Sequence, residues 1–304
     1  MTSSHPLSVA SLFSVKGWIA VVTGGGTGLG LTAAKTLAAN GAKVYITGRR
    51  IDVLETSARI HGAPENLGAN GGSIVPIAMD VTSKESIKAA VDTIIQKDGH
   101  VNLLVNNAGM FAGRAESKAA NGAEAYGDAM FAESIDDGWQ KSYLTNCTSI
   151  YFVTAAFLPL LAKASSSPSE KVGSVINISS VSGLLKISQD SQYSYNCSKA
   201  ATTHLTRQMA LELSHENINI CVNGIAPGYF PSEMTAGPSG DDNQSSDPGE
   251  PFRHFMSTMG AKVKRMGRPE ELASVILTLA TNEYIWGAIV PVDGGFLLQM
   301  PGVM

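Results

Sequence analysis

The sequence predicts an α/β fold in which helices cover both faces of one parallel sheet. Short runs rich in β-branched residues alternate with helix-length segments along most of the chain. Some runs, such as residues 174–178, carry apolar residues on both faces, as strands buried between two helix layers do. A glycine-rich turn separates the first run from the first helical pattern. These observations predict a doubly wound sheet of about seven strands.

The expected strands follow one another without a linker that would divide the chain. They cover Trp18–Thr23, Lys43–Thr47, Ser73–Met79, Val101–Asn106, Val172–Ser179, Ile218–Ile225 and Ala288–Val292. A chain of 304 residues is long for one domain, but α/β folds commonly reach this size. We therefore expect a single domain over residues 1–304, with residues 1–11 flexible.

The composition indicates a globular protein that acts on a small molecule. Hydrophobic residues make up 44% of the chain and charged residues 16%, and the net charge is −4 without any block of Lys or Arg. This balance argues against nucleic acid and against an anionic membrane as partner. Residues 1–17 lack the features of a signal peptide, and no apolar run approaches the ~18 residues that span a bilayer. The expected location is the cytoplasm.

The cysteines and histidines show no pattern of a disulfide framework or a metal site. Cys147, Cys197 and Cys221 are odd in number and lack Cys-x-x-Cys spacing, so we expect reduced, buried thiols. The six histidines contain no His-Glu-x-x-His motif. We therefore expect chemistry without a metal.

The first predicted strand ends in a turn that suits a phosphate. Its sequence is Thr23-Gly-Gly-Gly-Thr-Gly-Leu-Gly30, and a helical pattern follows. Glycines at 24, 28 and 30 allow a tight turn, close approach to a pyrophosphate and close packing of helix on strand. The helix N-terminus offers unsatisfied N–H groups to the anion. The alternative is a plain glycine-rich turn, which the order of strand, turn and helix makes less favoured.

The end of the second strand indicates which dinucleotide binds. The chain reads Gly48-Arg49 where an NAD site usually carries a carboxylate for the ribose hydroxyl. A guanidinium can hold a 2′-phosphate through charge-assisted hydrogen bonds, so NADP(H) is favoured over NAD(H). Asp80, after the third strand, could accept a hydrogen bond from the adenine amino group or could instead cap the helix near Ser83.

Tyr195 and Lys199 form a candidate catalytic pair. A helix turns about 100° per residue, so residues four apart lie on one face. The lysine charge is expected to lower the pKa of the Tyr195 phenol toward working pH, as a general acid or base requires. Tyr193 lies six positions before Lys199 and faces elsewhere on the same helix. The geometry therefore favours Tyr195.

With these motifs in order, the chain resembles the main branch of the short-chain dehydrogenase/reductase family, over about residues 12–298. The matching motifs are the glycine turn, Asn106-Asn-Ala-Gly109, Leu144-Thr-Asn-Cys147, Asn177-Ile-Ser-Ser180, Tyr195 with Lys199, Pro227-Gly228, Gly267-Arg-Pro-Glu270 and Val292-Asp-Gly-Gly295. The resemblance implies a Rossmann-type fold and a homodimer or homotetramer. A weaker resemblance points to 3-oxoacyl reductases and rhamnolipid-type ketoreductases, carried by residues 225–235 and the serine-rich stretch 164–169.

The resemblance also implies roles for individual residues. Tyr195 would exchange a proton with the substrate oxygen, Lys199 would lower its pKa and bind the nicotinamide ribose, Ser180 would donate to that oxygen, and Asn146 would hold a water next to Lys199. Cofactor contacts are implied for Gly24, Thr27, Gly28, Leu29, Gly30, Arg49, Asp80, Val81, Asn107, Ala108, Gly109, Tyr195, Lys199, Pro227, Gly228, Phe230 and Ser232. Ser179 and Ser182 compete with Ser180. Ser182 has the usual spacing of thirteen residues to Tyr195, but the Ser-Ser-x-x-Gly pattern selects Ser180.

The chain departs from the family pattern in three places. Thr27 stands where many NADP-preferring members carry a basic residue, so the cofactor preference depends on Arg49. An insertion at 111–135 either lines the substrate entrance, through Phe111, Met130 or Phe131, or decorates the outside. The long segment 229–262 is expected to be a substrate loop, and its polar part 236–252 is either a mobile lid or an inert insertion.

The leading hypothesis is an NADP(H)-dependent ketone reductase whose substrate has an apolar body. The same residues could serve an alcohol or polyol dehydrogenase in the oxidative direction. A third class is a protein that binds NADP(H) without redox chemistry, such as a scaffold or a cyclase, but such members usually lose the Tyr or the Lys. The helix faces at 153–161 and 205–213 could form the oligomer or simply pack on the sheet.

Overall fold

The computed structural model describes residues 5–69, 71–167 and 171–300, and within them the chain forms a seven-stranded parallel sheet. The strands are β1 (Ile19–Thr23), β2 (Lys43–Gly48), β3 (Ser73–Ala78), β4 (Leu103–Asn106), β5 (Gly173–Ile178), β6 (Ile220–Pro227) and β7 (Ile289–Val292). Their order across the sheet is β3-β2-β1-β4-β5-β6-β7, so the direction of winding reverses between β1 and β4. The predicted doubly wound, Rossmann-type fold is confirmed.

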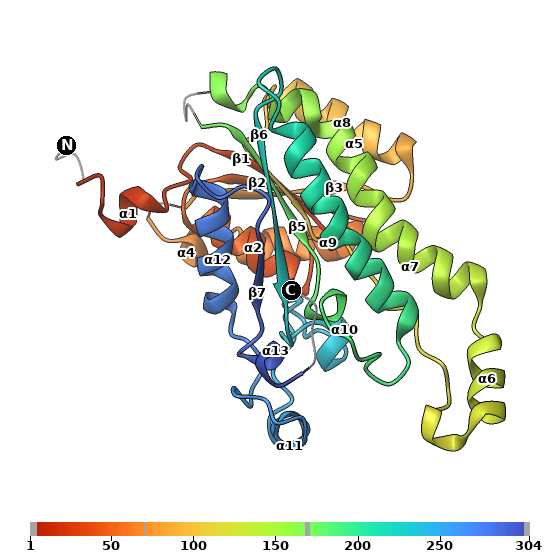
Figure 1. Ribbon diagram of the computed structural model, residues 1–304. Helices are drawn as coiled ribbons and strands as arrows, with labels where there is room; N and C mark the ends of the chain where they lie inside the picture. Colours follow the sequence, from red (N-terminus) through yellow and green to blue (C-terminus); the bar gives the residue numbers. More distant parts are fainter. Residues whose placement is uncertain (1–4, 70, 168–170, 301–304) are drawn as a thin grey trace.

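Helices cover both faces of the sheet (Figure 1). On one face lie α2 (Gly28–Ala39), α3 (Ile51–His61) and α12 (Pro269–Thr281). On the other face lie α5 (Lys84–Lys97), α8 (Ser149–Leu161) and α9 (Tyr193–Leu213). Fully buried side chains on these helices, such as Leu37 of α2 and Phe157 of α8, pack each helix layer against the strands. The remaining helical segments are α1 (Val9–Leu12), α4 (Pro64–Leu67), η1 (Ala119–Asn121), α6 (Ala123–Phe131), η4 (Ala164–Ser166), η5 (Val181–Gly183), α10 (Glu233–Ala236), α11 (Glu250–Thr258) and α13 (Phe296–Gln299).

A continuous helical run leads into α8. It passes through the π-helical turn η2 (Ile135–Gln140), α7 (Lys141–Tyr143) and a second π-helical turn, η3 (Leu144–Thr148). The run Ile135–Ser166 has 32 residues, and its most apolar window has a mean hydropathy of 1.5, enough by length and composition to cross a bilayer. The expectation that no stretch reaches that length is therefore wrong. Ile150 and Phe157 of this run are buried against the sheet, so this apolar character serves the core.

The segments expected to be irregular are partly ordered. Val9–Leu12 forms one helical turn that the Ser8 hydroxyl caps, and residues 1–4 lie outside the described residues. The expected flexibility of residues 1–11 stays a prediction. Residues 168 and 169 of the serine-rich stretch also lie outside them. Segment 229–262 contains α10 and α11. Its Tyr229 packs edge-on against Phe252 and Phe255 of the same segment and against Phe296 of α13.

The insertion 111–135 was expected either to line the substrate entrance or to decorate the outside, and its two ends differ. Phe111 at its start lines the cavity described below. Helix α6 has no buried residue and projects from the body of the protein (Figure 1). Met130 and Phe131 are 44% and 94% exposed and lie outside the cavity lining, so most of the insertion decorates the outside.

The cysteines differ from the expectation of three buried thiols. Cys221 is buried, Cys147 is half-buried and Cys197 is exposed. Cys197 lies on α9 with its side chain exposed to solvent. The prediction is therefore wrong for Cys197, because helix periodicity places only part of α9 in the core.

Candidate active site

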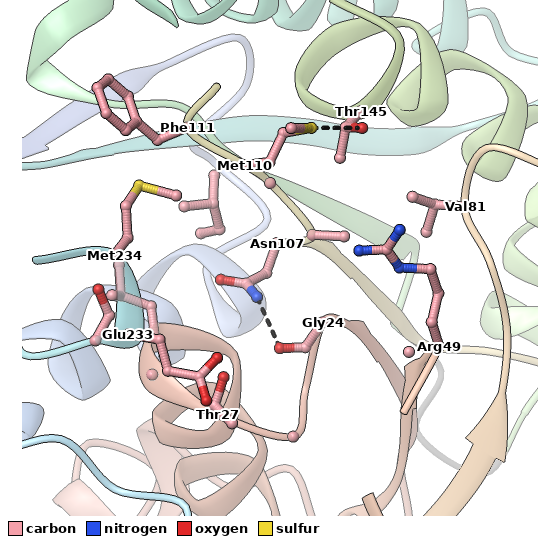
Figure 2. A pocket seen from close by; sticks show the side chains of 18 of the residues that line it. Gly24, Thr27, Arg49, Val81, Asn107, Met110, Phe111, Thr145, Glu233 and Met234 are labelled. Atoms are coloured by element: carbon pink, nitrogen blue, oxygen red, sulfur yellow. Dashed lines mark hydrogen bonds between the residues drawn. The ribbon is translucent and has the colours of Figure 1, made fainter. Parts of the chain in front are cut away.

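A cavity of about 920 Å³ lies at the carboxyl ends of the strands, beside the point where winding reverses (Figure 2). Ligands bind at this position in open α/β sheets. Its lining extends from the glycine-rich turn and Arg49 to Tyr195 and Lys199. The two groups of residues that the sequence analysis singled out therefore share one cavity.

The glycine-rich turn has the geometry that its sequence predicts. Gly24 and Gly28 have φ values of +63° and +52°, which glycine adopts without strain. A Cβ on Gly30 would lie 2.2 Å from the Gly24 carbonyl oxygen, so only glycine fits there. Thr27 precedes α2 but gives it no side-chain cap. The first N–H groups of α2 are therefore available to an anion in the cavity.

Asn107 fastens this turn to the end of β4. Its side-chain amide donates to the carbonyl oxygens of Thr23 and Gly24, at 3.0 and 3.1 Å. The backbone N–H groups of Asn107 and Ala108 both donate to the Thr23 hydroxyl at 3.0 Å. Asn107 was expected to contact the cofactor, and the structure adds a second task, which is to hold the glycine turn in place.

Arg49 and Asp80 both line the cavity, near enough for their charges to interact. The Arg49 guanidinium extends into it (Figure 2). Burial acts to raise the pKa of Asp80, but hydrogen bonds from Thr82 and the charge of Arg49 outweigh it and hold the pKa below its usual value. Asp80 Oδ1 accepts from the Thr82 N–H at 2.9 Å, and Ser83 caps α5. The alternative that Asp80 caps this helix is therefore wrong.

Tyr195 lies in the first turn of α9 and reaches the cavity beside Ser180. Burial raises the pKa of the Tyr195 phenol, and a hydrogen bond with the Ser180 side chain opposes that rise. Lys199 Nζ lies 6.0 Å from the Tyr195 ring centroid. The expectation that Lys199 lowers the pKa of Tyr195 is not met, because burial dominates and the ammonium group is bonded elsewhere.

Lys199 is 3% exposed and donates from Nζ to the Ile178 carbonyl oxygen at 2.9 Å. Burial lowers its pKa from 10.5 to about 8. A lysine with this pKa still carries its proton at neutral pH, but gives it up more readily than an exposed lysine. Lys199 therefore supplies a buried positive charge next to the candidate proton donor.

The three candidate serines, Ser179, Ser180 and Ser182, differ in their hydrogen-bond partners and in their position relative to the cavity. The Ser180 side chain bonds with Tyr195 and accepts from the Ser182 N–H at 3.1 Å. Ser179 Oγ instead donates to the Lys199 carbonyl oxygen at 2.9 Å and so anchors α9. Ser182 is buried outside the cavity lining. Among the three serines, Ser180 is therefore the one that bonds with Tyr195.

Asn146 is fully buried behind the cavity. Its side chain accepts from the Met110 N–H at 2.8 Å and donates to the Met110 carbonyl and the Ser198 hydroxyl, both at 2.9 Å. The π-helical turn η3 frees the Asn146 carbonyl, which accepts from Thr202 at 2.7 Å. Asn146, in η3, thus joins the loop after β4 to α9. The water-holding role implied by the resemblance stays a prediction.

All but two of the expected site residues line this cavity. The exceptions are Gly30, which packs beneath the turn, and Asn146. Those in the lining are Gly24, Thr27, Gly28, Leu29, Arg49, Asp80, Val81, Asn107, Ala108, Gly109, Ser180, Tyr195, Lys199, Pro227, Gly228, Phe230 and Ser232. No cluster of three His, Cys, Asp or Glu side chains with metal-binding geometry occurs in the described ranges.

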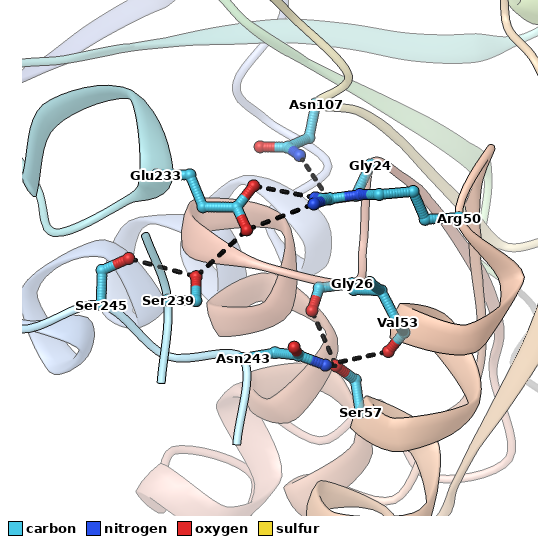
Figure 3. A network of polar contacts seen from close by, with 10 residues as sticks. All are labelled: Gly24, Gly26, Arg50, Val53, Ser57, Asn107, Glu233, Ser239, Asn243 and Ser245. Atoms are coloured by element: carbon cyan, nitrogen blue, oxygen red, sulfur yellow. Dashed lines mark hydrogen bonds and ion pairs between the residues drawn. The ribbon is translucent and has the colours of Figure 1, made fainter. Parts of the chain in front are cut away.

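Residues 232–235 of the expected substrate loop line one side of the cavity, and the polar contacts of residues 232–245 with the glycine-rich turn and α3 are what sequence reasoning missed (Figure 3). Glu233 pairs with Arg50 at 2.8 Å, and both line the cavity. Asn243 Nδ2 donates to the Ser57 hydroxyl at 2.8 Å, and Ser57 in turn donates to the Gly26 carbonyl at 2.7 Å. The polar segment is thus bonded to the phosphate-binding turn, and no local sequence signal pairs residues so far apart.

Comparison with known proteins decides the family. The family model for short chain dehydrogenase matches residues 18–242. The chain belongs to the short-chain dehydrogenase family. This dehydrogenase is 33% identical to the short-chain dehydrogenase/reductase VdtF of Byssochlamys spectabilis, over 97% of both chains. It is 34% identical to the rhamnolipids biosynthesis 3-oxoacyl-[acyl-carrier-protein] reductase of Pseudomonas aeruginosa, over 94% of this chain and 98% of that one.

A solved structure supports the same assignment for this short-chain dehydrogenase. The Pseudomonas aeruginosa RhlG/NADP active-site complex matches with a TM-score of 0.74 and 32% identity, over 94% of this chain and 98% of that chain. The predicted family is therefore confirmed, and with it an oxidoreductase that binds a nicotinamide cofactor and acts on a small molecule.

Proposed function

We propose that this short-chain dehydrogenase uses NADPH to reduce a ketone to a secondary alcohol, with Tyr195 as the proton donor. The observation that carries the proposal is the single cavity that joins the glycine-rich turn and Arg49 to Tyr195, Ser180 and Lys199. When bound, the nicotinamide cofactor supplies a hydride to the carbonyl carbon. The protein's own residues supply the proton and stabilise the charge that develops.

The chain's own residues provide proton transfer and charge stabilisation. Tyr195 donates its phenolic proton to the carbonyl oxygen, while the Ser180 hydroxyl donates a hydrogen bond to the same oxygen. The buried Lys199 charge stabilises the tyrosinate that forms when Tyr195 gives up its proton. Phe111, whose ring meets Tyr195 edge-on at 5.8 Å, and Met234 add apolar surface for the body of the substrate.

Arg49 supports NADPH over NADH as the physiological cofactor. It extends into the cavity at the end of β2, and Gly48 stands where a competing carboxylate would repel a 2′-phosphate. The similarity to a reductase solved as an NADP complex supports the same preference.

The experiment that tests the cofactor proposal is a fluorescence titration with NADPH and NADH. In the Arg49→Ala variant the Kd for NADPH should rise roughly 10- to 100-fold, the loss expected for charge-assisted hydrogen bonds, while the Kd for NADH should stay unchanged. Arg59→Ala is the matched control, because Arg59 is exposed on α3 outside the cavity lining. Equal loss of both cofactors, or no loss, would contradict the proposed preference.

The proton-transfer step needs its own test. Tyr195→Phe should bind NADPH as the wild type does but lose at least about a hundredfold in kcat for ketone reduction, the contribution of general acid catalysis. Tyr284→Phe is the control, since Tyr284 is 97% exposed. Full activity of Tyr195→Phe would point instead to a binding protein or to a different proton donor.

We further propose a homodimer or homotetramer that uses the outer faces of α8 and α9. Tyr151 of α8 is 52% exposed and Leu211 of α9 is 73% exposed, while their inner faces pack on the sheet. Light scattering on the purified protein tests this, and a monomer at micromolar concentration would contradict it.

A further inference from the structure

A turn of unusual backbone conformation precedes the candidate proton donor. Gln189, Asp190 and Ser191 have φ values of +51°, +62° and +65°. Three consecutive non-glycine residues in the left-handed region are strained, and such a conformation persists only where surrounding contacts hold it. The turn leads directly into α9, which begins at Tyr193 and carries Tyr195. Its stability therefore bears on the first turn of α9, which carries Tyr195.

The insertion 111–135 supplies the contacts that hold this turn. The Tyr126 hydroxyl lies 2.9 Å from Ser191 Oγ and 2.9 Å from the Tyr193 hydroxyl. Ser191 is only 4% exposed, so this contact is shielded from water. Tyr126 is the point at which the otherwise exposed helix α6 reaches the body of the protein.

Charge pairs and a backbone bond join the same two segments. Lys118 Nζ lies 3.1 Å from Asp190 Oδ1, and an Arg114 nitrogen lies 3.7 Å from Asp190 Oδ2. The Ala115 N–H donates to the Ser191 carbonyl at 3.4 Å. The ion pairs are exposed and screened, so the partly buried hydroxyl contact of Tyr126 is the stronger constraint.

The held turn also contacts segment 229–262. Gln189 Nε2 donates to the Tyr229 hydroxyl at 3.4 Å. Tyr229 lies near enough to Tyr195 to act on the pKa of its phenol, and it packs in the aromatic cluster of segment 229–262. A line of contacts thus runs from the insertion through the turn to Tyr229, whose neighbours in sequence, Gly228 and Phe230, line the cavity.

We infer that Tyr126 is a positioning residue that braces the 189–191 turn and thereby sets the shape of the substrate entrance. The inference rests on the proposed function, because it assigns the entrance to a ketone. Tyr195 itself is held independently, since Ser180 bonds with it and Ser179 anchors α9 through the Lys199 carbonyl. Loss of the brace should therefore weaken substrate binding more than it slows the chemical step.

The test is Tyr126→Phe, which removes the hydroxyl and keeps the ring. We expect KM for the ketone to rise about three- to tenfold, the effect of losing a hydrogen bond, while kcat and the Kd for NADPH stay within about twofold of the wild type. Ser191→Ala breaks only one of the two contacts of the Tyr126 hydroxyl, so it should give a smaller rise. The double variant should not exceed Tyr126→Phe alone, because the contact with Ser191 is already lost there. Tyr284→Phe is the control for loss of an exposed tyrosine hydroxyl.

Hydrogen exchange gives a readout that needs no substrate. Amides 189–193 should exchange faster in Tyr126→Phe than in the wild type, with the rest of α9 unchanged. If amides 189–193 exchange at the wild-type rate in Tyr126→Phe, Tyr126 does not brace the turn. If they exchange faster but KM for the ketone is unchanged, the turn does not shape the substrate entrance. If the wild-type protein reduces no ketone, the proposed function fails while the exchange result still tests the brace.

Discussion

Lys199 should make the protein less stable than it would be with an apolar side chain at that position. Its pKa falls from 10.5 to about 8 on burial, so the charged form costs the folded state about 3 kcal/mol. In Lys199→Met this cost disappears, while the Ile178 carbonyl loses its donor at a cost of about 1 kcal/mol. The net prediction is a gain of about 2 kcal/mol at pH 7. For a chain of this length that corresponds to a rise in Tm of about 3 °C.

The pH dependence identifies the cause of this gain. Below pH 8 the wild-type lysine is charged in both states, and the full cost is present. As the pH rises from about 8 toward 10.5, the folded protein releases the proton first and the cost fades. The advantage of Lys199→Met should therefore vanish near pH 10.

The assay is urea unfolding of nucleotide-free protein at pH 7 and pH 10, with Lys16→Met as the control at an exposed position. A gain of the same size at both pH values would mean that packing, and not charge, causes it. A variant less stable than the wild type at pH 7 would refute the reasoning. Because the same lysine serves the site, the stabilised variant should also lose ketone reduction.

Three further predictions follow from contacts described above. Gly30→Ala should abolish NADPH binding in a fluorescence titration, because its Cβ would lie 2.2 Å from a carbonyl oxygen of the turn. Phe157→Ala should destabilise the protein by about 3–5 kcal/mol in urea unfolding, whereas Phe131→Ala, at a position 94% exposed, should change stability by less than about 0.5 kcal/mol. Glu233→Gln should speed NADPH dissociation in stopped flow by no more than about fivefold, because the pair with Arg50 is largely exposed, and high salt should have the same effect on the wild type.

The fold was predictable because its signals are local. Each β-branched run became a strand within two residues of the expected bounds, since strands buried on both faces need continuous apolar sequence. The glycine turn was predictable for the same reason, as glycine alone fits the backbone of Gly28 and the packing at Gly30. Tyr195 and Lys199 came together because one helix carries both.

The features that sequence reasoning missed depend on contacts between distant segments. Arg50 and Glu233 are 183 positions apart, and nothing in either neighbourhood indicates the other. Tyr126 meets Ser191 across 65 positions through a turn whose left-handed residues are not glycines. The direction of the Tyr195 pKa shift was also wrong, because spacing along a helix gives the nearby charge but not the extent of burial.

The exposed thiol of Cys197 gives this protein a built-in chemical probe. It lies on α9 between Tyr195 and Lys199, and the next two residues along the helix, Ser198 and Lys199, are buried. A maleimide reagent should therefore modify Cys197 much faster than the buried Cys221 in the native protein. Any subunit that covers this face of α9 would slow that labelling, so the reaction rate at one natural cysteine measures assembly without an engineered tag.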